Sequence, residues 1–340
     1  MNIPYRTQQN LKRLALVLLV LAVAAMLVLL CWFLWLNRFV VYTRDGARFD
    51  LENSSENIRG ELAVPPVEEN LIPIYYNEGE DTVRTGKELV QMTGFFIDAK
   101  MLQTDMDRVM TQVAELPPDT AVMLEVKNSF GSYFYSTSVS PFRTDSVDVA
   151  RVDELIRMMN ESERSLYTIA CLPALRDYSF GLNNEQNGLP TRGGYLWADE
   201  EYRYWLNPAK EGTYNYLKAT AEELRNLGFD EVVFLDYRFP DTESIVFNGD
   251  KLETLAVTAQ NLVNSCSTSY FAVSFQGSEG FVAPSGRSRV YFMDVAAIEA
   301  ESIAENYEVA DVAVNLVFIT DLYDTRFDIY SVLRPMASAT

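Results

Sequence analysis

Three segments that read as β-strands carry an acidic and a basic side chain two residues apart near their C-terminal ends. The pairs are Asp98 with Lys100, Glu125 with Lys127, and Asp236 with Arg238. Side chains two residues apart on a strand point to the same face, so each pair sets a carboxylate beside a cation. Two carboxyl groups that face one bond can supply an acid and a base or nucleophile. The sequence therefore points to chemistry carried by carboxylates.

The chain contains no histidine. Catalytic triads that use histidine, and zinc or iron sites with histidine ligands, are therefore excluded. Cleavage of a glycosidic bond by two carboxyl groups needs no histidine, and we assign Asp236 as nucleophile or base and Glu125 as the partner acid. Lys127 and Arg238 would orient charge around them. The alternative is that these side chains form an ion-pair network that closes the end of a barrel.

A long loop rich in aromatic residues follows the third predicted strand, from Asp177 to Pro208. Aromatic rings present a flat apolar face with a polar edge, which suits the face of a sugar. We predict that Trp197, Trp205 and Tyr237 contact carbohydrate and that Asp98 belongs to the same substrate-binding site. The alternative is that at least half of the loop rings only pack the loop against the barrel.

Strand-like and helix-like segments alternate after residue 88, an order typical of a parallel sheet with crossover helices. Seven strands are predicted, at Thr93–Met101, Ala121–Asn128, Tyr167–Leu175, Glu231–Phe239, Tyr270–Gln276, Arg289–Val295 and Asp311–Ile319. Asp328–Arg334 supplies a short eighth strand, and about 250 residues is the usual length of a TIM-like (β/α)8 barrel, the α/β fold that we predict. Only Leu322 to Phe327 separate the last two strands, too few for a standard crossover helix. The ring is therefore expected to be irregular or open there.

The stretch from Leu14 to Leu36 is 23 residues long and contains no charge, proline or glycine. It is long enough to cross a bilayer core of about 30 Å, and it ends in bulky aromatic residues, unlike the small-residue cleavage site of a signal peptide. Basic residues flank it on both sides, so the orientation is inferred from the tendency of long following domains to be translocated. We predict a cytoplasmic N-terminus (1–13), a single-pass transmembrane helix that acts as a signal-anchor (14–36), a juxtamembrane stalk (37–88) and an extracytoplasmic barrel domain (89–340).

The chain is strongly acidic, with a formal net charge of −20 at pH 7. Nucleic acid is therefore not expected as a partner, whereas the membrane is, through residues 14–36. No cofactor is expected, and no residue pattern specifies a metal site, although the many acids leave room for Ca²⁺. Outside the apolar segment the chain has two cysteines, Cys171 and Cys266, for which two buried thiols are favoured over one disulfide.

Four stretches carry a resemblance to a known family. They are LEVKNSFGSYFYST from Leu124, YTIACLPALRD from Tyr167, YWLNP from Tyr204 and LGFDEVVFLDYRFP from Leu227. With them, the region from Thr93 to Arg334 resembles a bacterial family of putative glycoside hydrolases, whose (β/α)8 barrels are similar to those of the α-amylases. The resemblance implies a protein that acts on or binds carbohydrate of the cell envelope or exterior.

Two positions depart from the family pattern. The family aspartate of F-D-Y-V-R-F-P aligns with Leu235, and Asp236 follows one place later. A one-residue move along a strand turns a side chain to the opposite face unless a bulge intervenes. The family arginine of I-A-R aligns with Cys171. These departures keep open a catalytically degenerate pseudoenzyme, serving as a cell-envelope scaffold or a glycan-binding module.

Overall fold

The computed structural model describes residue 26 and residues 40–43, 46–49, 88–142, 146–160 and 165–336. The chain divides into two units, Met1–Ile58 and Arg59–Thr340. In the first, β1 (Val40–Thr43) and β2 (Gly46–Phe49) form a short antiparallel hairpin. The predicted transmembrane segment, apart from Met26, and most of the predicted stalk lie outside the described residues. Within the described ranges, none of the helices has the length and apolar character needed to cross a bilayer.

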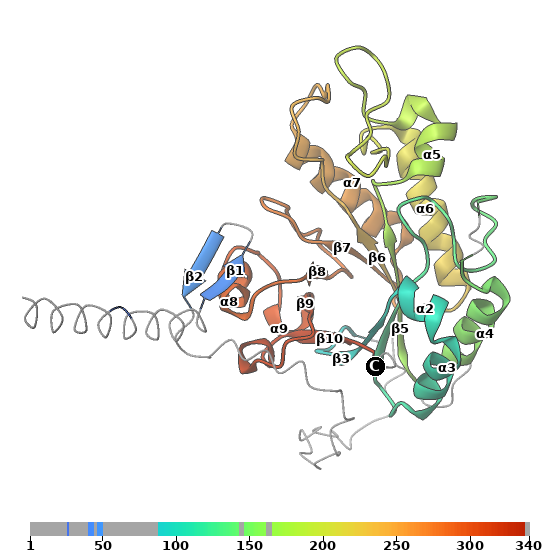
Figure 1. Ribbon diagram of the computed structural model, residues 1–340, viewed down its shortest axis with the longest axis vertical. Coiled ribbons are helices and arrows are strands. Elements are labelled where there is room, and N and C mark those ends of the chain that lie inside the picture. The colour runs from blue at the N-terminus through green and yellow to red at the C-terminus, as the bar shows by residue number, and fades with distance from the viewer. Residues whose placement is uncertain are drawn as a thin grey trace, which may run out of the picture. The chain divides into compact units, whose positions relative to one another are not determined.

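The second unit contains eight parallel strands that close into a barrel (Figure 1). The strands are β3 (Thr93–Ile97), β4 (Ala121–Glu125), β5 (Tyr167–Pro173), β6 (Glu231–Leu235), β7 (Ala272–Gln276), β8 (Val290–Met293), β9 (Leu316–Ile319) and β10 (Ser331–Pro335). The predicted barrel is confirmed. The ring is closed by parallel pairing of β10 with β3, so the expectation of an open stretch is wrong.

Helices lie outside the ring, where Figure 1 shows α6 and α7 beside β6 and β7. The α-helices of this unit are α2 (Ala99–Thr104), α3 (Met106–Glu115), α4 (Val149–Asn160), α5 (Tyr178–Asn183), α6 (Glu211–Asn226), α7 (Lys251–Cys266), α8 (Ala300–Glu305) and α9 (Val312–Asn315). Residues 277–289, between β7 and β8, contain no helix, and residues 320–330 contain only the 3-10 turn η4 (Thr325–Phe327). The expected irregularity is therefore confirmed. The ring is closed, but the connections from β7 to β8 and from β9 to β10 contain no crossover α-helix.

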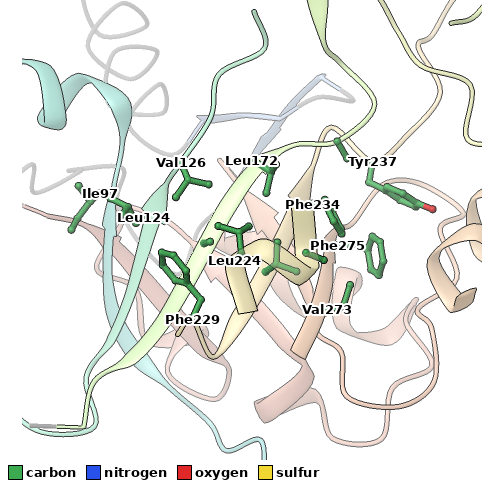
Figure 2. Packing of buried hydrophobic residues seen from close by; sticks show 14 of the residues in the cluster. Ile97, Leu124, Val126, Leu172, Leu224, Phe229, Phe234, Tyr237, Val273 and Phe275 are labelled. Atoms are coloured by element: carbon green, nitrogen blue, oxygen red, sulfur yellow. The ribbon is translucent and has the colours of Figure 1, made fainter. Parts of the chain in front are cut away.

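Alternate residues of each strand build two separate apolar layers, because successive side chains point to opposite faces. Met123 and Val233 belong to the lumen of the barrel, whereas Leu124 and Phe234 belong to the outer layer. Figure 2 shows this outer layer, with Leu224 of α6 among the strand side chains. A residue's place in this alternation therefore tells whether it faces the lumen or the helices.

The N-terminal end of the barrel is filled by a buried polar cluster. Arg289 Nη1 lies 2.6 Å from Glu231 Oε2, and the two side chains are 1% and 0% exposed. The Tyr167 hydroxyl donates to the same Glu231 oxygen at 2.8 Å, and the Ser274 hydroxyl donates to the other. Arg289 Nη2 also donates to the Val90 carbonyl at 2.8 Å, which fastens the segment before β3. Each charge of this cluster is thus directly paired.

Both cysteines of the barrel are free and buried, as the sequence favoured. Cys171 faces the lumen, and Cys266 ends α7 in the outer layer.

Candidate functional site

The C-terminal end of a barrel of this kind is where active sites are built, and Glu125 reaches it as the last residue of β4. Ala121 and Met123 precede it on the lumen face, so the strand alternation directs Glu125 to the lumen. Its Oε2 accepts the Ala99 N–H at 2.8 Å. Burial raises the pKa of Glu125. The hydrogen bond from Ala99 lowers this pKa, and the negative charge of nearby Asp98 raises it further. A carboxyl group that keeps its proton more readily suits a general acid.

Asp98 and Lys100 do not form the expected pair on a strand. The strand β3 ends at Ile97, and Asp98 is the N-cap of α2, where its Oδ1 accepts the Met101 N–H at 2.8 Å. Lys100 is therefore a residue of the helix. The sequence suggested a longer strand because the N-cap aspartate follows the apolar run directly.

Asp236 follows β6 with φ +50°, in the left-handed backbone region. Phe234 before it and Tyr237 after it both lie in the outer layer, with their rings 5.8 Å and 4.6 Å from that of Phe275 (Figure 2). In a regular strand, two residues three apart would face opposite sides, so Asp236 acts as the extra residue of a bulge. Leu235 faces the lumen. In a regular strand the next residue, Asp236, would face the outer layer, and the bulge prevents this.

The carboxylate of Asp236 makes no hydrogen bond or ion pair with any described residue, whereas its backbone N–H donates to Gln276 Oε1 at 2.7 Å. Burial raises the pKa of Asp236, and the positive charges of Arg176 and Arg238 oppose that rise. Asp236 thus offers two acceptor oxygens near the charges of two guanidinium groups, a combination that suits a polyhydroxylated ligand.

An ion pair from the aromatic loop lies beside Asp236. Arg176 Nε is 2.7 Å from Asp199 Oδ2, and the same oxygen accepts the Trp205 indole N–H at 3.1 Å. Burial would raise the pKa of Asp199, but the hydrogen bonds it accepts, that from Arg176 foremost, hold it below its usual value. The Arg238 guanidinium lies 5.0 Å from the Trp205 ring centroid. The sequence analysis did not single out Arg176 or Asp199, although charged residues within and directly before an aromatic loop were a usable signal.

Lys127 is not paired with Glu125, and this corrects the expected acid and base on one strand face. Its ammonium is fully buried, 2.7 Å from Asp177 Oδ2, and also donates to the Pro173 carbonyl at 2.9 Å and to the Tyr216 hydroxyl at 3.2 Å. The ion pair fixes the start of α5, because the other Asp177 oxygen caps that helix. Such burial keeps Lys127 away from a ligand at the barrel mouth.

Two of the predicted sugar contacts are buried. Tyr237 is 1% exposed and donates its hydroxyl to the Leu255 carbonyl of α7 at 3.0 Å, and Trp205 is 3% exposed. Trp197, 6.5 Å from Trp205 between ring centroids, remains half-buried. The interpretation that loop rings pack the loop therefore holds for Trp205, and Tyr237, after β6, is buried against α7. The most exposed rings of this loop are instead Tyr195 and Tyr202, at 78% and 79%.

Glu125 and Asp236 stand at different levels of the barrel. The strand register aligns Glu125 with Cys171 and Cys171 with Val233. Asp236 is thus two strands across and three residues further along, a Cα separation of about 14 Å. Glycosidase carboxyl groups lie about 5–9.5 Å apart, so a shared substrate requires both side chains to lean toward each other.

Two surface grooves occur elsewhere among the described residues. One of about 440 Å³ lies between α6 and α7, and one of about 530 Å³ lies beside α6. Neither is lined by a predicted site residue. Within the described ranges, no cluster of three His, Cys, Asp or Glu side chains could hold a metal ion.

Residues 96–269 match the family model described as "Putative glycosyl hydrolase domain". The chain belongs to this family. No curated protein matches the chain. The two residues that depart from the family pattern both face the lumen. Leu235 lies at the end of β6, and Cys171 lies on β5. Burial raises the pKa of the Cys171 thiol, and the Glu125 charge raises it further.

Solved structures with similar folds come from several bacteria. An α-galactosidase from Geobacillus stearothermophilus, in complex with raffinose, has a TM-score of 0.50 at 10% identity over 74% of this chain and 40% of that chain. A β-N-acetylhexosaminidase from Bacteroides fragilis has a TM-score of 0.47 at 8% identity over 69% and 50%. A hypothetical protein from Ruminiclostridium thermocellum has a TM-score of 0.45 at 18% identity over 53% and 96%. This chain thus spans half or less of the two enzymes, and the likeness to the galactosidase shows the fold alone.

Proposed function

We propose that this protein binds carbohydrate at the C-terminal mouth of its barrel, outside the cytoplasm, while a transmembrane helix at residues 14–36 holds it at the cell membrane. The observation that carries the binding proposal is the presentation of Asp236. A left-handed residue at the end of β6 compensates for the one-place shift of the family aspartate. The Asp236 carboxylate has no hydrogen-bond or ion-pair partner among the described residues, and the positive charges of Arg176 and Arg238 act on it.

Carboxylate and guanidinium groups together suit the hydroxyl groups of a sugar. The carboxylate accepts hydrogen bonds and the guanidinium donates several in a fixed plane, so one ligand can satisfy both. Hydrogen bonds to charged groups are stronger than neutral ones. Membership of a glycosyl hydrolase family supports carbohydrate as the ligand class.

Binding is favoured over hydrolysis because the Cα atoms of Glu125 and Asp236 lie about 14 Å apart, whereas the two carboxyl groups of a glycosidase lie about 5–9.5 Å apart. Burial raises the pKa of both carboxyl groups. Leu235 also occupies the lumen position where the family pattern has aspartate. Hydrolysis is the second candidate, with Glu125 as acid and Asp236 as base, and the unpaired Asp236 carboxylate favours it.

The membrane tether rests on the sequence of residues 14–36, which carry no charge. A cell-envelope glycan is then the nearest carbohydrate to the domain. Nucleic acid is a poor partner for a chain of net charge −20. Extraction of cell membranes with alkaline carbonate tests the tether, because an integral protein stays in the pellet and a released domain does not.

The binding test uses the full chain in detergent micelles, titrated calorimetrically with chitohexaose, maltohexaose, raffinose and peptidoglycan fragments. At least one should bind, and Asp236→Asn should weaken binding about 10-fold, the loss expected for a hydrogen bond to a charged group. Asp119→Asn is the matched control, since Asp119 is an exposed aspartate with φ +61°, in the turn before β4. Absence of binding to every glycan would contradict the proposal.

The same glycans decide between binding and hydrolysis. Products with new reducing ends, released by the parent chain and abolished by both Asp236→Asn and Glu125→Gln, would establish the second candidate. Binding without any product supports the proposal as stated.

A further inference from the structure

The aromatic loop ends in a tight turn of residues 199–203. Ala198 pairs with Tyr204 in antiparallel fashion. The turn is closed by the Asp199 N–H bound to the Arg203 carbonyl at 2.9 Å and the Tyr202 N–H bound to the Asp199 carbonyl at 3.0 Å. It is therefore an ordered hairpin.

The Asp199 carboxylate fixes this turn from inside. It accepts four hydrogen bonds, from Arg176 Nε at 2.7 Å, Trp205 Nε1 at 3.1 Å, the Glu201 N–H at 3.0 Å and the Arg203 N–H at 2.9 Å. A carboxylate with four donors has its acceptor sites filled. Asp199 thus holds the turn and cannot itself act on a ligand.

The turn is also docked onto the loop after β4. Arg203 Nε donates to the Ser129 hydroxyl at 3.2 Å, and the Arg203 guanidinium lies 3.2 Å from the Phe130 ring centroid. The Arg203 residue is only 9% exposed. Two loops of the barrel mouth are thereby joined at this point.

The side chains of Glu200 and Tyr202 make no hydrogen bond among the described residues, whereas Glu201 accepts one from Arg176 Nη2 at 2.9 Å. Of the two, only Tyr202 carries a ring. The residue has φ +60° and is 79% exposed. The left-handed region is costly for a bulky L residue, and glycine or asparagine would fit it better. Such strain persists where the surroundings impose it, and it gathers at ligand sites. The hydrogen bonds of Asp199 and Arg203 are what impose it here.

The turn belongs to the same part of the mouth as Asp236, because Arg176 binds Asp199 and its charge also acts on Asp236. We propose that Tyr202 is a carbohydrate-contacting residue, whose ring the rigid turn presents to the face of a sugar bound at Asp236. This inference rests on the proposed function and adds a specific contact to it.

The test compares three variants of the full chain in detergent micelles, with the glycan panel used for Asp236. Tyr202→Ala should weaken binding about 10-fold, the upper range for an aromatic contact, and Tyr202→Phe should retain binding within about twofold. Tyr202→Gly should weaken binding as much as Tyr202→Ala does. Its Tm should rise by about 2–4 °C, because glycine removes the backbone strain. A ring needed only for folding would instead lower Tm together with affinity.

Two controls match the side chain and the backbone. Tyr270→Ala removes another exposed tyrosine, before β7 at the opposite end of the barrel, and should leave affinity unchanged. Asp119→Gly relieves another left-handed residue and should change Tm alone. Unchanged affinity in Tyr202→Ala, with a parent that binds, would overturn this inference and leave the proposed function standing. A parent that binds no glycan would overturn both.

Discussion

The two ends of the barrel treat charge in opposite ways. At the N-terminal end, Arg289 and Glu231 are buried and bound to each other. At the C-terminal end, Asp236 is only half-buried, and among the described residues its carboxylate has no direct partner. The first arrangement pairs both charges within the fold, whereas the second leaves carboxylate oxygens available to something outside it. Our proposal for the binding end therefore rests on the unfilled hydrogen-bonding capacity of Asp236 and not on charge alone.

Left-handed backbone conformations do not separate the two ends, because Asp119 and Ser165, before β4 and β5, adopt them at the N-terminal end. Asp236 and Asp294, directly after β6 and β8, both have left-handed φ values, +50° and +56°. Both lie at the C-terminal end, where strain at a functional site is expected.

The largest effect is expected from breaking the N-terminal cluster. Arg289→Met leaves Glu231 charged and buried, and should lower the free energy of unfolding by about 3–5 kcal/mol. Denaturation in urea followed by tryptophan fluorescence measures this loss. Glycan affinity of the folded fraction should not change. A loss below about 1 kcal/mol would show that this end does not depend on its ion pair.

A smaller loss of stability is expected from substituting Lys127. This residue lies near the C-terminal end of the barrel and is fully buried, like the N-terminal cluster. Lys127→Met leaves Asp177 without its cation but with the Tyr216 hydroxyl at 2.8 Å and the Phe180 N–H at 2.8 Å. These donors should limit the loss to about 2–3 kcal/mol. The double variant with Asp177→Asn should recover part of it. A double variant less stable than Lys127→Met would contradict this account.

The smallest effect is the pH dependence contributed by Asp236. Burial raises its pKa above the ordinary 3.8, so the folded state holds this proton more tightly than the unfolded state. The stability contributed by this group is therefore lost as the pH rises from about 3.8 through the folded pKa. Asp236→Asn should remove that loss, so its stability relative to the parent should grow with pH.

Urea denaturation of the full chain between about pH 4 and pH 7 measures the difference. Asp294→Asn, an exposed aspartate with a similar backbone angle, is the control. A parent and an Asp236→Asn variant with parallel pH profiles would show that the Asp236 carboxyl is not buried in solution.

The eight strands could be predicted because each is a short apolar run between turn residues, as Val232 to Leu235 illustrates. The alternation with helical stripes then implied a parallel barrel. The strand ends were less predictable. Asp98 continues an apolar run in the sequence, yet it caps a helix, and only its side-chain hydrogen bond to Met101 makes the difference.

The site was predicted less fully than the fold, because its partners are distant in the chain. Lys127 and Asp177 are 50 residues apart, and the loop ion pair of Arg176 and Asp199 depends on how that loop folds back. The orientation of Asp236 depends on one left-handed residue, which no hydrophobic period reveals. Spacing on a strand placed Glu125 and Asp236 at the C-terminal end of the barrel, but it gave the wrong partners for Lys127 and Asp98.

Closure of the barrel by β10 also sets the order in which the protein can be completed. Val332 pairs with Thr93, 239 residues earlier in the chain. A ribosome adds about 5–20 residues per second, so β3 waits about 12–48 s for its partner. During that interval β3, with Phe95 and Phe96, is an apolar strand with one unpaired edge, the kind of edge that other chains can join. Nascent chains of this protein are therefore most exposed to aggregation late in synthesis, just before the last strand emerges.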